Sequence, residues 1–313
     1  MPEPLLTQSV IAFVWDFDRT LIAGDMQAPI FEAFDLDEGE FWAEVDALVG
    51  YHAARGEMVD RDMAHLIHLL TYVRTGKLPG LSNDMLRELG ARLRPVSGMP
   101  DFMAATRSRV SEIPEFRREG ITVEHYVVST GIRPMIEGTV FRQHLDGIWA
   151  NTFIEAAAPP GFLDTSPTSG AAAGITQIGM PMGDTAKTRA IFEINKGVNV
   201  DPSLDVHAPM AESRRRVPLR NMIYVADGAS DVPAFSILNA GGGKTFGVAV
   251  EGADDAARVE QLAAQGRIQG MAVGDFRPGS PAYVWLMDGL EQIGYEIVEE
   301  RRQALAQVPP AAD

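Results

Sequence analysis

The sequence predicts an α/β protein with a parallel central sheet, into which a separate helical segment is inserted. Three observations indicate this class. The continuous apolar run at residues 10–15 is typical of a strand buried on both faces, as in parallel sheets. Residues 24–94 show helical periodicity and no strand pattern. From residue 121 onward, strand-like and helix-like segments alternate along the chain.

The inserted segment follows the first strand directly. Apolar residues recur at helical spacing in residues 41–49 and again in residues 63–73. Ser82 is placed to cap a third helix, and the proline-rich residues 95–100 mark the exit of the chain. We therefore predict a helical domain at residues 24–96, inserted between residues 1–23 and 97–313 of the core.

The remaining elements are predicted from apolar runs and the turn residues between them. Residues 150–183 are rich in Ala, Gly, Pro and Thr, and they predict either a hairpin or a flap within the core. Residues 198–220 are typical of a loop. The other expected elements are strands at 121–129, 221–226, 245–250 and 268–273, and helices from Pro134, at 185–195 and at 281–305.

Composition limits the classes of function. The chain has 313 residues and a formal net charge of −16, which argues against a general nucleic-acid or anionic-membrane surface. A small anionic substrate remains compatible, because a bound metal ion can reverse the local sign of charge. The absence of cysteine excludes thiol chemistry and disulfides. No secretory signal and no apolar stretch of about 18 residues is visible, so we expect a cytoplasmic protein.

Polar side chains follow three of the predicted strands. The carboxyl ends of parallel strands meet at one edge of a sheet, where ligands bind in open α/β folds. Several carboxylates gathered there would repel one another unless a hard cation neutralised them, and an oxygen-only ligand set favours Mg²⁺. Lys187, early in its helix, adds positive charge. The clusters are Asp16 with Asp18, Ser129 with Thr130, and Asp227 with Asp231.

The residues and their order resemble the four motifs of the haloacid dehalogenase superfamily, and in particular its phosphoserine-phosphatase-like members. The resemblance covers nearly the whole chain and implies a Rossmann-like three-layer core with a helical cap. It rests on Asp16-Phe-Asp18-Arg-Thr20, then Ser129-Thr-Gly131, then Lys187, then Asp227-Gly-Ala-Ser-Asp231.

The resemblance also implies a role for each motif residue. Asp16 would be the nucleophile that forms an aspartyl-phosphate, and Asp18 the general acid and base. Ser129 and Lys187 would hold the phosphoryl oxygens, and Thr130 and Gly131 would contact the substrate. Mg²⁺ would be held by the Asp16 carboxylate, the Asp18 backbone carbonyl and Asp227, with Asp231 as a ligand or an anchor behind them.

Three positions depart from the family pattern. Ala226 stands where glycine is usual before the fourth motif. Arg19 replaces a small residue and could face the cap or the substrate. Asp25 stands where phosphoserine phosphatases resemble one another in using a glutamate to meet the substrate ammonium, and its side chain is one methylene shorter.

Several of these residues also have a purely structural interpretation. Asp16 and Asp18 could form a capped turn, Lys187 could be an exposed helix lysine, and Ser129 and Asp231 could be helix caps. Gly241-Gly-Gly-Lys-Thr245 is interpreted as a turn, because Leu238 occupies the position where a phosphate-binding loop needs glycine.

Other residues leave two interpretations open. His65 and His68 are one helical turn apart and could form part of a metal site, but no third ligand is indicated. The arginine run at residues 214–216 predicts a solvated loop, with a site for an anionic partner or a substrate phosphate as the alternative. Four apolar residues could line the substrate pocket or pack inside the cap: Met26, Phe31, Phe34 and Trp42.

The function predicted from the sequence is therefore hydrolysis of a small phosphorylated metabolite by a Mg²⁺-dependent phosphatase. Two alternatives stay open at this point. A phosphotransferase or phosphomutase would pass the phosphoryl group to an alcohol, and a non-catalytic protein would use the same residues for metal-dependent ligand binding.

Overall fold

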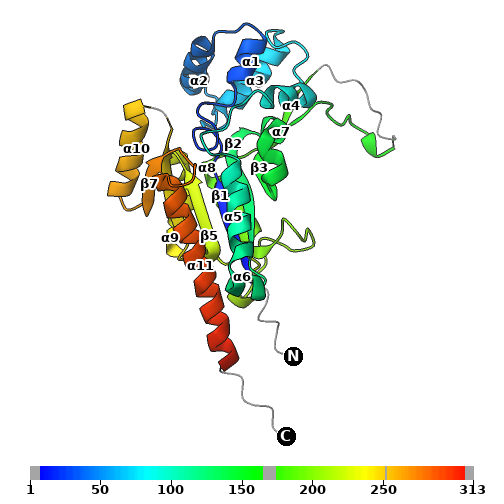
Figure 1. Ribbon diagram of the computed structural model, residues 1–313. Coiled ribbons are helices and arrows are strands. Elements are labelled where there is room, and N and C mark those ends of the chain that lie inside the picture. Colours follow the sequence, from blue (N-terminus) through cyan, green and yellow to red (C-terminus); the bar gives the residue numbers. More distant parts are fainter. Residues whose placement is uncertain (1–7, 165–173, 251, 307–313) are drawn as a thin grey trace.

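The computed structural model describes residues 8–164, 174–250 and 252–306. At its centre lies a seven-stranded sheet with the strand order β4-β3-β2-β1-β5-β6-β7 (Figure 1). All neighbouring strands are parallel except β3 and β4, which are antiparallel. The predicted α/β class is confirmed. The strands are β1 (Val10–Trp15), β2 (Thr122–Ile132), β3 (Gly147–Ile154), β4 (Gln177–Met180), β5 (Met222–Ala226), β6 (Lys244–Ala249) and β7 (Gly270–Val273).

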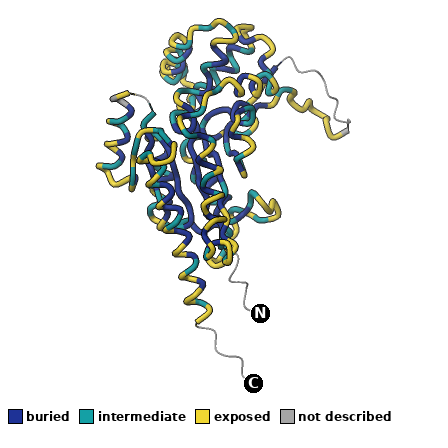
Figure 2. Tube along the Cα trace, viewed as in Figure 1, coloured by how far each residue is buried: buried dark blue, intermediate teal, exposed yellow. Residues whose placement is uncertain are grey.

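Helices cover both faces of the sheet, so that the core has three layers. Every residue of β1 is buried, and alternate side chains enter two separate apolar clusters on opposite faces (Figure 2). One cluster includes residues of α5 (Asp101–Glu112), α6 (Pro114–Arg118) and α11 (Pro281–Ala306). The other includes residues of α8 (Asp184–Lys196), α9 (Val232–Ala240) and α10 (Gly252–Ala264).

Four helices lie together beyond the carboxyl ends of the strands, at the top of Figure 1. They are α1 (Ala28–Ala33), α2 (Glu38–Ala53), α3 (Ala64–Arg74) and α4 (Asn83–Gly90). The Val96 backbone N–H donates to the Leu21 carbonyl at 3.0 Å, so the chain enters and leaves this group at adjacent points. Ser82 caps α4 as predicted, since its hydroxyl accepts from the Met85 N–H at 3.1 Å.

Helix α4 packs closely on α7 (Arg133–Gly138) of the core through two glycines. A Cβ atom at Gly90 would lie 2.0 Å from the Met135 carbonyl oxygen, and one at Gly138 would lie 1.9 Å from the Arg87 carbonyl oxygen. These distances are far below van der Waals contact, so only glycine permits this approach of the two backbones. The last helix of the inserted segment is thereby joined to the core.

The structure corrects several sequence-based boundaries. Strand β2 continues three residues past the predicted end at Ser129, and an irregularity in its register against β3 lies between Val128 and Ile132. The sequence did not predict β3, α9 or α10. The pattern of β3 is obscured by Ala150, Asn151 and Thr152 in its centre.

The segment 150–183 contains an antiparallel pair at its two ends, which supports the hairpin interpretation over a flap without regular structure. Phe153 of β3 pairs with Ile178 of β4. Residues 165–173 of this segment lie outside the described residues.

Two other motifs from the sequence analysis are structural. Residues 241–243 form the turn between α9 and β6, as predicted, whereas Lys244 and Thr245 already belong to β6. Gly242 has a positive φ of 77°. In the arginine run, Arg216 is not fully solvated, because it forms an ion pair with Glu124 of β2. One Nη of Arg216 donates to a Glu124 carboxylate oxygen at 2.7 Å.

A buried polar chain lies under the end of β1. The Trp15 indole N–H donates to Nδ1 of His125 at 3.1 Å, so the imidazole proton is on Nε2, which faces the Thr106 hydroxyl at 2.9 Å. Thr106 in turn donates to the Met103 carbonyl at 2.8 Å. Burial lowers the pKa of His125 well below its usual range, which keeps the ring neutral. These hydrogen bonds fix the side chain of Trp15, the residue before Asp16.

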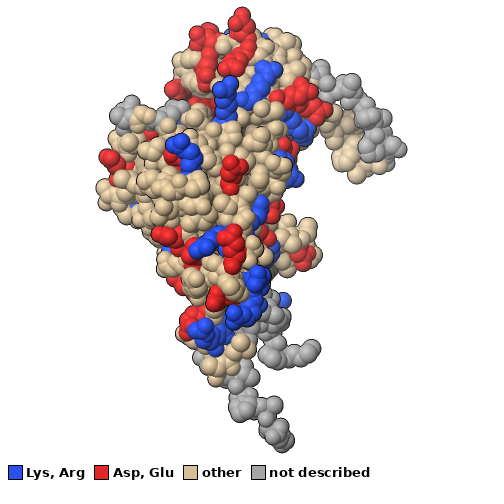
Figure 3. Space-filling model, in the orientation of Figure 1, with Lys and Arg blue, Asp and Glu red and all other residues tan. Residues whose placement is uncertain are grey.

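The surface carries no segregated charge on the face shown in Figure 3, where acidic and basic side chains are interspersed. Among the helices of the described residues, none combines the length and the apolar character needed to cross a bilayer.

Candidate active site

The site forms where β1 and β5 end side by side at the carboxyl edge of the sheet. The Asp16 N–H donates to the Val225 carbonyl at 2.9 Å, which continues the parallel ladder one residue beyond β1. This bond orients Asp16, whose residue is 6% exposed. Phe17 is fully buried and packs edge-on against Phe141, so it anchors the chain between the two carboxylates. The local sequence therefore holds Asp16 and Asp18 on either side of a core residue.

Lys187 joins Asp16 to Asp231 at the base of the site. Its Nζ lies 3.1 Å from Asp16 Oδ1 and 2.6 Å from Asp231 Oδ1. Burial alone would lower the pKa of Lys187, but the two carboxylates hold it well above its usual range. The lysine is therefore a charged ammonium in a buried position, and the interpretation of an exposed helix lysine is wrong.

Asp231 is held by more than the lysine. The Tyr224 hydroxyl donates to Asp231 Oδ1 at 2.7 Å, and the Ser230 hydroxyl donates to Oδ2 at 3.1 Å. Both carboxylate oxygens thus accept hydrogen bonds, so Asp231 is suited to orienting Lys187. Asp231 lies at the start of α9, but its side chain forms no capping hydrogen bond there.

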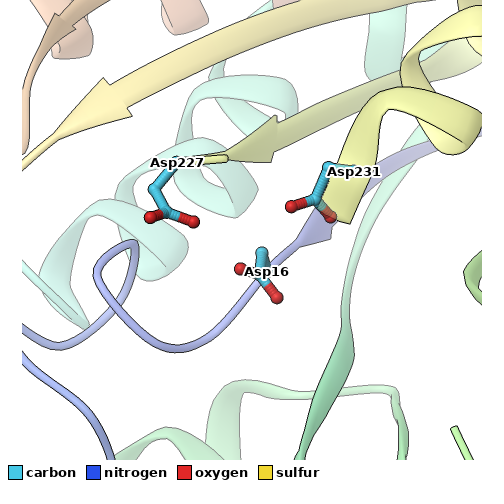
Figure 4. A group of neighbouring side chains, drawn as sticks. All are labelled: Asp16, Asp227 and Asp231. Carbon is cyan, nitrogen blue, oxygen red and sulfur yellow. The ribbon is translucent and has the colours of Figure 1, made fainter. Parts of the chain in front are cut away.

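Asp16, Asp227 and Asp231 form one carboxylate cluster. One oxygen of each lies within 4.8 Å of the others, and Figure 4 shows the three side chains next to one another. Burial and then Asp231 raise the pKa of Asp227 to about 6. Burial likewise raises the pKa of Asp16, although Lys187 opposes that shift. The three neighbouring carboxylates form an oxygen-only donor set that fits a hard divalent cation such as Mg²⁺.

Asp18 lies apart from this cluster. Its Oδ1 accepts from the Met26 N–H at 2.7 Å. Burial, followed by the charge of Asp25, raises the pKa of Asp18 to about 8. A carboxyl with this pKa is mostly protonated at neutral pH and can donate a proton. The Asp18 carboxylate is not part of the three-carboxylate group, and metal binding by the Asp18 backbone carbonyl stays a prediction.

Residues 129–131 lie beside the cluster on β2. The Ser129 hydroxyl is buried and accepts from the Gly131 N–H at 2.9 Å. The amide of Asn151, on β3, donates to the carbonyls of Thr130 and Gly131 at 2.5 and 3.1 Å. These bonds hold the irregular end of β2 in place. The helix-cap interpretation of Ser129 is wrong, since the residue lies within a strand.

A pocket of about 270 Å³ opens above these residues. Ser129, Lys187 and Asp231 lie behind its lining. Two larger hollows, of about 490 and 540 Å³, lie along the outer side of α3, away from the carboxylate cluster. The smaller pocket is the candidate active site because the reactive groups converge there. Nine of its lining residues are discussed in the sequence analysis, namely Asp16, Asp18, Arg19, Asp25, Trp42, His65, Thr130, Gly131 and Asp227. The others are Gln27 from the inserted segment and Ser230 and Arg258 from the core.

Arg19 and Asp25 face each other at the mouth of this pocket. Nε and one Nη of Arg19 each lie 3.2 Å from an Asp25 carboxylate oxygen. Arg19 has a positive φ of 54°, which is uncommon for a residue other than glycine. Another Arg19 nitrogen lies 3.9 Å from Asp255 of α10, and Asp255 is ion-paired with Arg258. Because α10 was not predicted, its contribution to the site could not be seen in the sequence.

Two residues before and within α3 connect the inserted segment to the core. Asp62 Oδ2 accepts from the Asp184 N–H at 2.9 Å and so caps α8, the helix that carries Lys187. Burial lowers the pKa of His65 to about 4, against hydrogen bonds to the backbone of Asp62 and Thr130. The two predicted histidines have separate environments, because His68 bonds to Glu44 at 2.7 Å. No sequence pattern indicated Asp62.

The four apolar residues near the start of the inserted segment divide between the two interpretations. Met26 and Phe31 are buried in the main apolar cluster, and Phe34 packs against it. Trp42 packs there too and also lines the pocket.

No family model matches the chain. An uncharacterized protein of Borreliella burgdorferi is 32% identical over 285 residues, which are 90% of this chain and 96% of that protein. A solved structure of a probable phosphoserine phosphatase from Vibrio cholerae, unliganded, superposes with a TM-score of 0.51 and 14% identity, covering 93% of this chain and 68% of that chain.

A crystal structure of a HAD family hydrolase from Salmonella enterica serovar Typhi has a TM-score of 0.49 and 15% identity, over 87% of this chain and 69% of that chain. The likeness to the Vibrio cholerae structure extends over almost the whole chain at low identity, so it concerns the fold. The chain has the haloacid dehalogenase-like fold and belongs to the same family as the uncharacterized protein of Borreliella burgdorferi.

Proposed function

We propose that this protein is a Mg²⁺-dependent phosphatase that hydrolyses a small phosphorylated metabolite through an aspartyl-phosphate at Asp16. The observation that carries the proposal is one buried arrangement. Asp16 lies 3.1 Å from the Lys187 ammonium and within the carboxylate cluster, while the neighbouring Asp18 has a pKa of about 8. A nucleophile, a proton donor and a fixed positive charge are the groups that phosphoryl transfer requires.

The first step would be attack by the free carboxylate oxygen of Asp16 on phosphorus. A bond forms between this oxygen and phosphorus as the bond to the leaving-group oxygen breaks, and Asp18 donates its proton to that oxygen. In the second step, Asp18 removes a proton from water as the water attacks phosphorus, which releases phosphate and restores Asp16. Lys187 and the Ser129 hydroxyl would bind the phosphoryl oxygens and stabilise the charge that develops on them.

The carboxylates of Asp16 and Asp227, with the backbone carbonyl of Asp18, are the groups that would hold Mg²⁺, which supplies positive charge that lets an anionic phosphate approach the carboxylates. Asp231 would keep Lys187 in position through the bond of 2.6 Å. We also propose that residues 24–96 act as the cap, because Gln27, Trp42 and His65 enclose the side of the pocket opposite the cluster. The leaving group would lie on that side.

The probable phosphoserine phosphatase from Vibrio cholerae shares this fold, and phosphatase chemistry agrees with the groups gathered at Asp16. The same observation disfavours a protein that only binds ligand, because binding alone gives no reason for a carboxyl with a raised pKa at Asp18.

Release of phosphate from a panel of phosphomonoesters, with Mg²⁺ and with EDTA, tests the proposal. We expect Mg²⁺-dependent release by the wild type and none by Asp16→Asn, because an amide is not a nucleophile of comparable strength. Asp37→Asn is the matched control, since Asp37 is exposed and caps α2 away from the pocket. Activity in Asp16→Asn would disprove the role of Asp16. Transfer to added acceptor alcohols, with little free phosphate, would show a phosphotransferase instead.

A further inference from the structure

The side of the pocket that faces the cap indicates what kind of leaving group it accepts. This inference rests on the proposed function and concerns the same site. The residues on that side are Arg19, Asp25, Gln27, Trp42 and His65. The charge and the hydrogen-bonding capacity of these residues decide which substrates can enter.

The carboxylate on this side is already paired. Asp25 accepts two hydrogen bonds from the Arg19 guanidinium at 3.2 Å each, and both side chains are 33% exposed. A substrate ammonium would have to displace this guanidinium before it could bind Asp25. Exchanging the Arg19–Asp25 ion pair for an ammonium–Asp25 pair adds little to the free energy of binding, and the ammonium also loses its hydration.

The cations at the pocket are paired in the same way. Arg19 binds Asp25, and Arg258 forms an ion pair with Asp255 and lies 3.9 Å from Asp227. A carboxylate on the substrate would therefore meet arginines whose charge is balanced by neighbouring acids. His65 adds no charge at neutral pH, because burial keeps its pKa at about 4. The cap side of the pocket is consequently close to neutral overall.

Gln27 supplies hydrogen-bonding capacity without charge. It is only 5% exposed, yet it lines the pocket. Within the described part of the chain, its side-chain amide forms no hydrogen bond, and neither amide atom is among the fully enclosed polar atoms. The amide therefore reaches the pocket space with a free donor and a free acceptor. A hydroxyl group, which both donates and accepts, is its natural partner.

Trp42 presents an aromatic surface to the same space. Its indole N–H donates to Glu38 at 3.2 Å, and its ring lies 6.3 Å from the His65 ring at a tilt of 34°. These contacts hold the indole in one orientation, so its face can pack against the C–H groups of a ligand.

From these observations we infer that the leaving group is uncharged and carries hydroxyl groups, so that the substrate is the phosphate of a small polyol or sugar. The Gln27 amide binds a hydroxyl of the leaving group, and Trp42 packs against its carbon chain. The volume of about 270 Å³ must hold the phosphoryl group as well, which limits the leaving group to a few carbons.

Four substrates of similar size separate the charge classes. They are glycerol 1-phosphate (uncharged leaving group), phosphoethanolamine (cationic leaving group), phosphoserine (zwitterionic leaving group) and 3-phosphoglycerate (anionic leaving group), assayed with Mg²⁺ beside p-nitrophenyl phosphate. We expect kcat/KM for glycerol 1-phosphate to exceed that of each charged substrate by about tenfold or more. A higher value for any charged substrate, with p-nitrophenyl phosphate hydrolysed, would overturn this inference alone. No release from any of the five compounds would overturn the phosphatase proposal and this inference with it.

Two variants test the residues themselves. Gln27→Leu should lower the ratio of kcat/KM for glycerol 1-phosphate to that for p-nitrophenyl phosphate by about fivefold to tenfold, the effect of one lost hydrogen bond. Gln303→Leu, an exposed glutamine near the far end of α11, should leave the ratio unchanged. Equal ratios in Gln27→Leu and the wild type would contradict the role of Gln27.

Arg19→Ala should shift the substrate preference toward a cationic leaving group. Removing the guanidinium leaves the Asp25 carboxylate without the ion-pair partner that lies 3.2 Å from it in the wild type. The ratio of kcat/KM for phosphoethanolamine to that for glycerol 1-phosphate should then rise by about tenfold. An unchanged ratio would show that the ion pair does not set the charge preference.

Discussion

Lys187 is the residue on which the candidate site depends most directly. It is fully buried, and it places one ammonium between two carboxylates that would otherwise face each other. Buried ion pairs cost desolvation, so their net contribution to stability is modest as long as both partners are present. Removing only one partner is different, because it leaves a buried charge without compensation.

Lys187→Met should therefore reduce stability as well as activity. We expect the free energy of unfolding at pH 7, measured by urea denaturation, to fall by about 3–5 kcal/mol. Phosphatase activity should fall by about 10²-fold or more, since one fixed charge at the phosphoryl group is lost. Lys244→Met, at a half-buried lysine that bonds to Gln292, should change stability by less than about 1 kcal/mol. Equal stability of the two variants would contradict the role of Lys187 in compensating the buried charges of Asp16 and Asp231.

Asp18 gives a prediction about pH. Its folded-state pKa of about 8 means that the protonated form, which donates to the leaving group, predominates below this pH and is lost above it. Activity on alkyl phosphates should thus fall as the pH rises through about 8. Asp18→Asn should lower kcat by about 10²- to 10⁴-fold on alkyl phosphates. The loss should be smaller on an aryl phosphate, whose leaving group needs less protonation, and an equal loss on both would argue against a general acid.

Among single residues, the sequence predicted those whose type and spacing are chemically unusual. Asp16, Asp18 and Asp227 stand at strand ends, and such a pattern is visible without coordinates. Gln27 and Asp62 are ordinary polar residues in the sequence. Their relevance follows from what the fold places opposite them, and no local pattern encodes that.

Helix α8 shows how one element depends on another. Its N-cap residue, Gly183, has no side chain to satisfy the first N–H groups, and Asp62 from the inserted segment supplies the acceptor. A Cβ at Gly183 would lie 2.8 Å from Asp62 Oδ2, so the glycine also makes room for this contact. The start of the helix that carries Lys187 is thus completed by a residue of the inserted segment.

Asp62→Ala should therefore lower activity more than its stability cost would suggest. Losing a helix cap costs about 1 kcal/mol. Asp37→Ala, which removes the cap of α2 at a hydrogen bond of 2.8 Å, should have a similar cost. Only Asp62→Ala should lower kcat, by about tenfold, because Lys187 is displaced. Asp62→Asn should recover most of the rate, since an amide oxygen still accepts, and equal kcat values in the two alanine variants would contradict this coupling.

The elements that the sequence predicted are those with an unbroken pattern. Strand β1 is apolar throughout, and α8 has helical periodicity with a glycine at its end. Strand β3 was missed because polar and small residues interrupt it, although tertiary contacts bury Asn151. For such segments the environment in the folded protein outweighs local preference.

The whole molecule carries a net charge of −16 and gathers three carboxylates at one buried point. Repulsion among them opposes folding unless cations offset it, and Lys187 supplies only one positive charge. A divalent ion that binds the folded state alone would stabilise it by mass action. The charge pattern of the whole chain is readable from composition, whereas this local concentration needs the fold.

Mg²⁺ should accordingly raise the thermal stability of the protein. At 100 times the dissociation constant the gain is about 2.7 kcal/mol, or roughly 5 °C in Tm for a chain of this size. Asp227→Asn should remove most of this shift, and Asp37→Asn should not. Because the pKa of Asp227 is about 6, protons should compete with the ion, so the shift should shrink between pH 7 and pH 5. A shift independent of Asp227 would place the ion elsewhere.

The buried chain from Trp15 to Met103 provides a spectroscopic signal at the site. The protein contains four tryptophans. Trp15 is fully buried and precedes Asp16 directly, and its indole N–H donates to the neutral imidazole of His125. Its ¹H–¹⁵N resonance should exchange slowly with solvent and should respond when the Asp16 carboxylate changes its bonding. Trp42 reports from the opposite wall of the pocket. Nuclear magnetic resonance of two native indoles in ¹⁵N-enriched protein can therefore follow chemistry on one side and leaving-group binding on the other, without any attached probe.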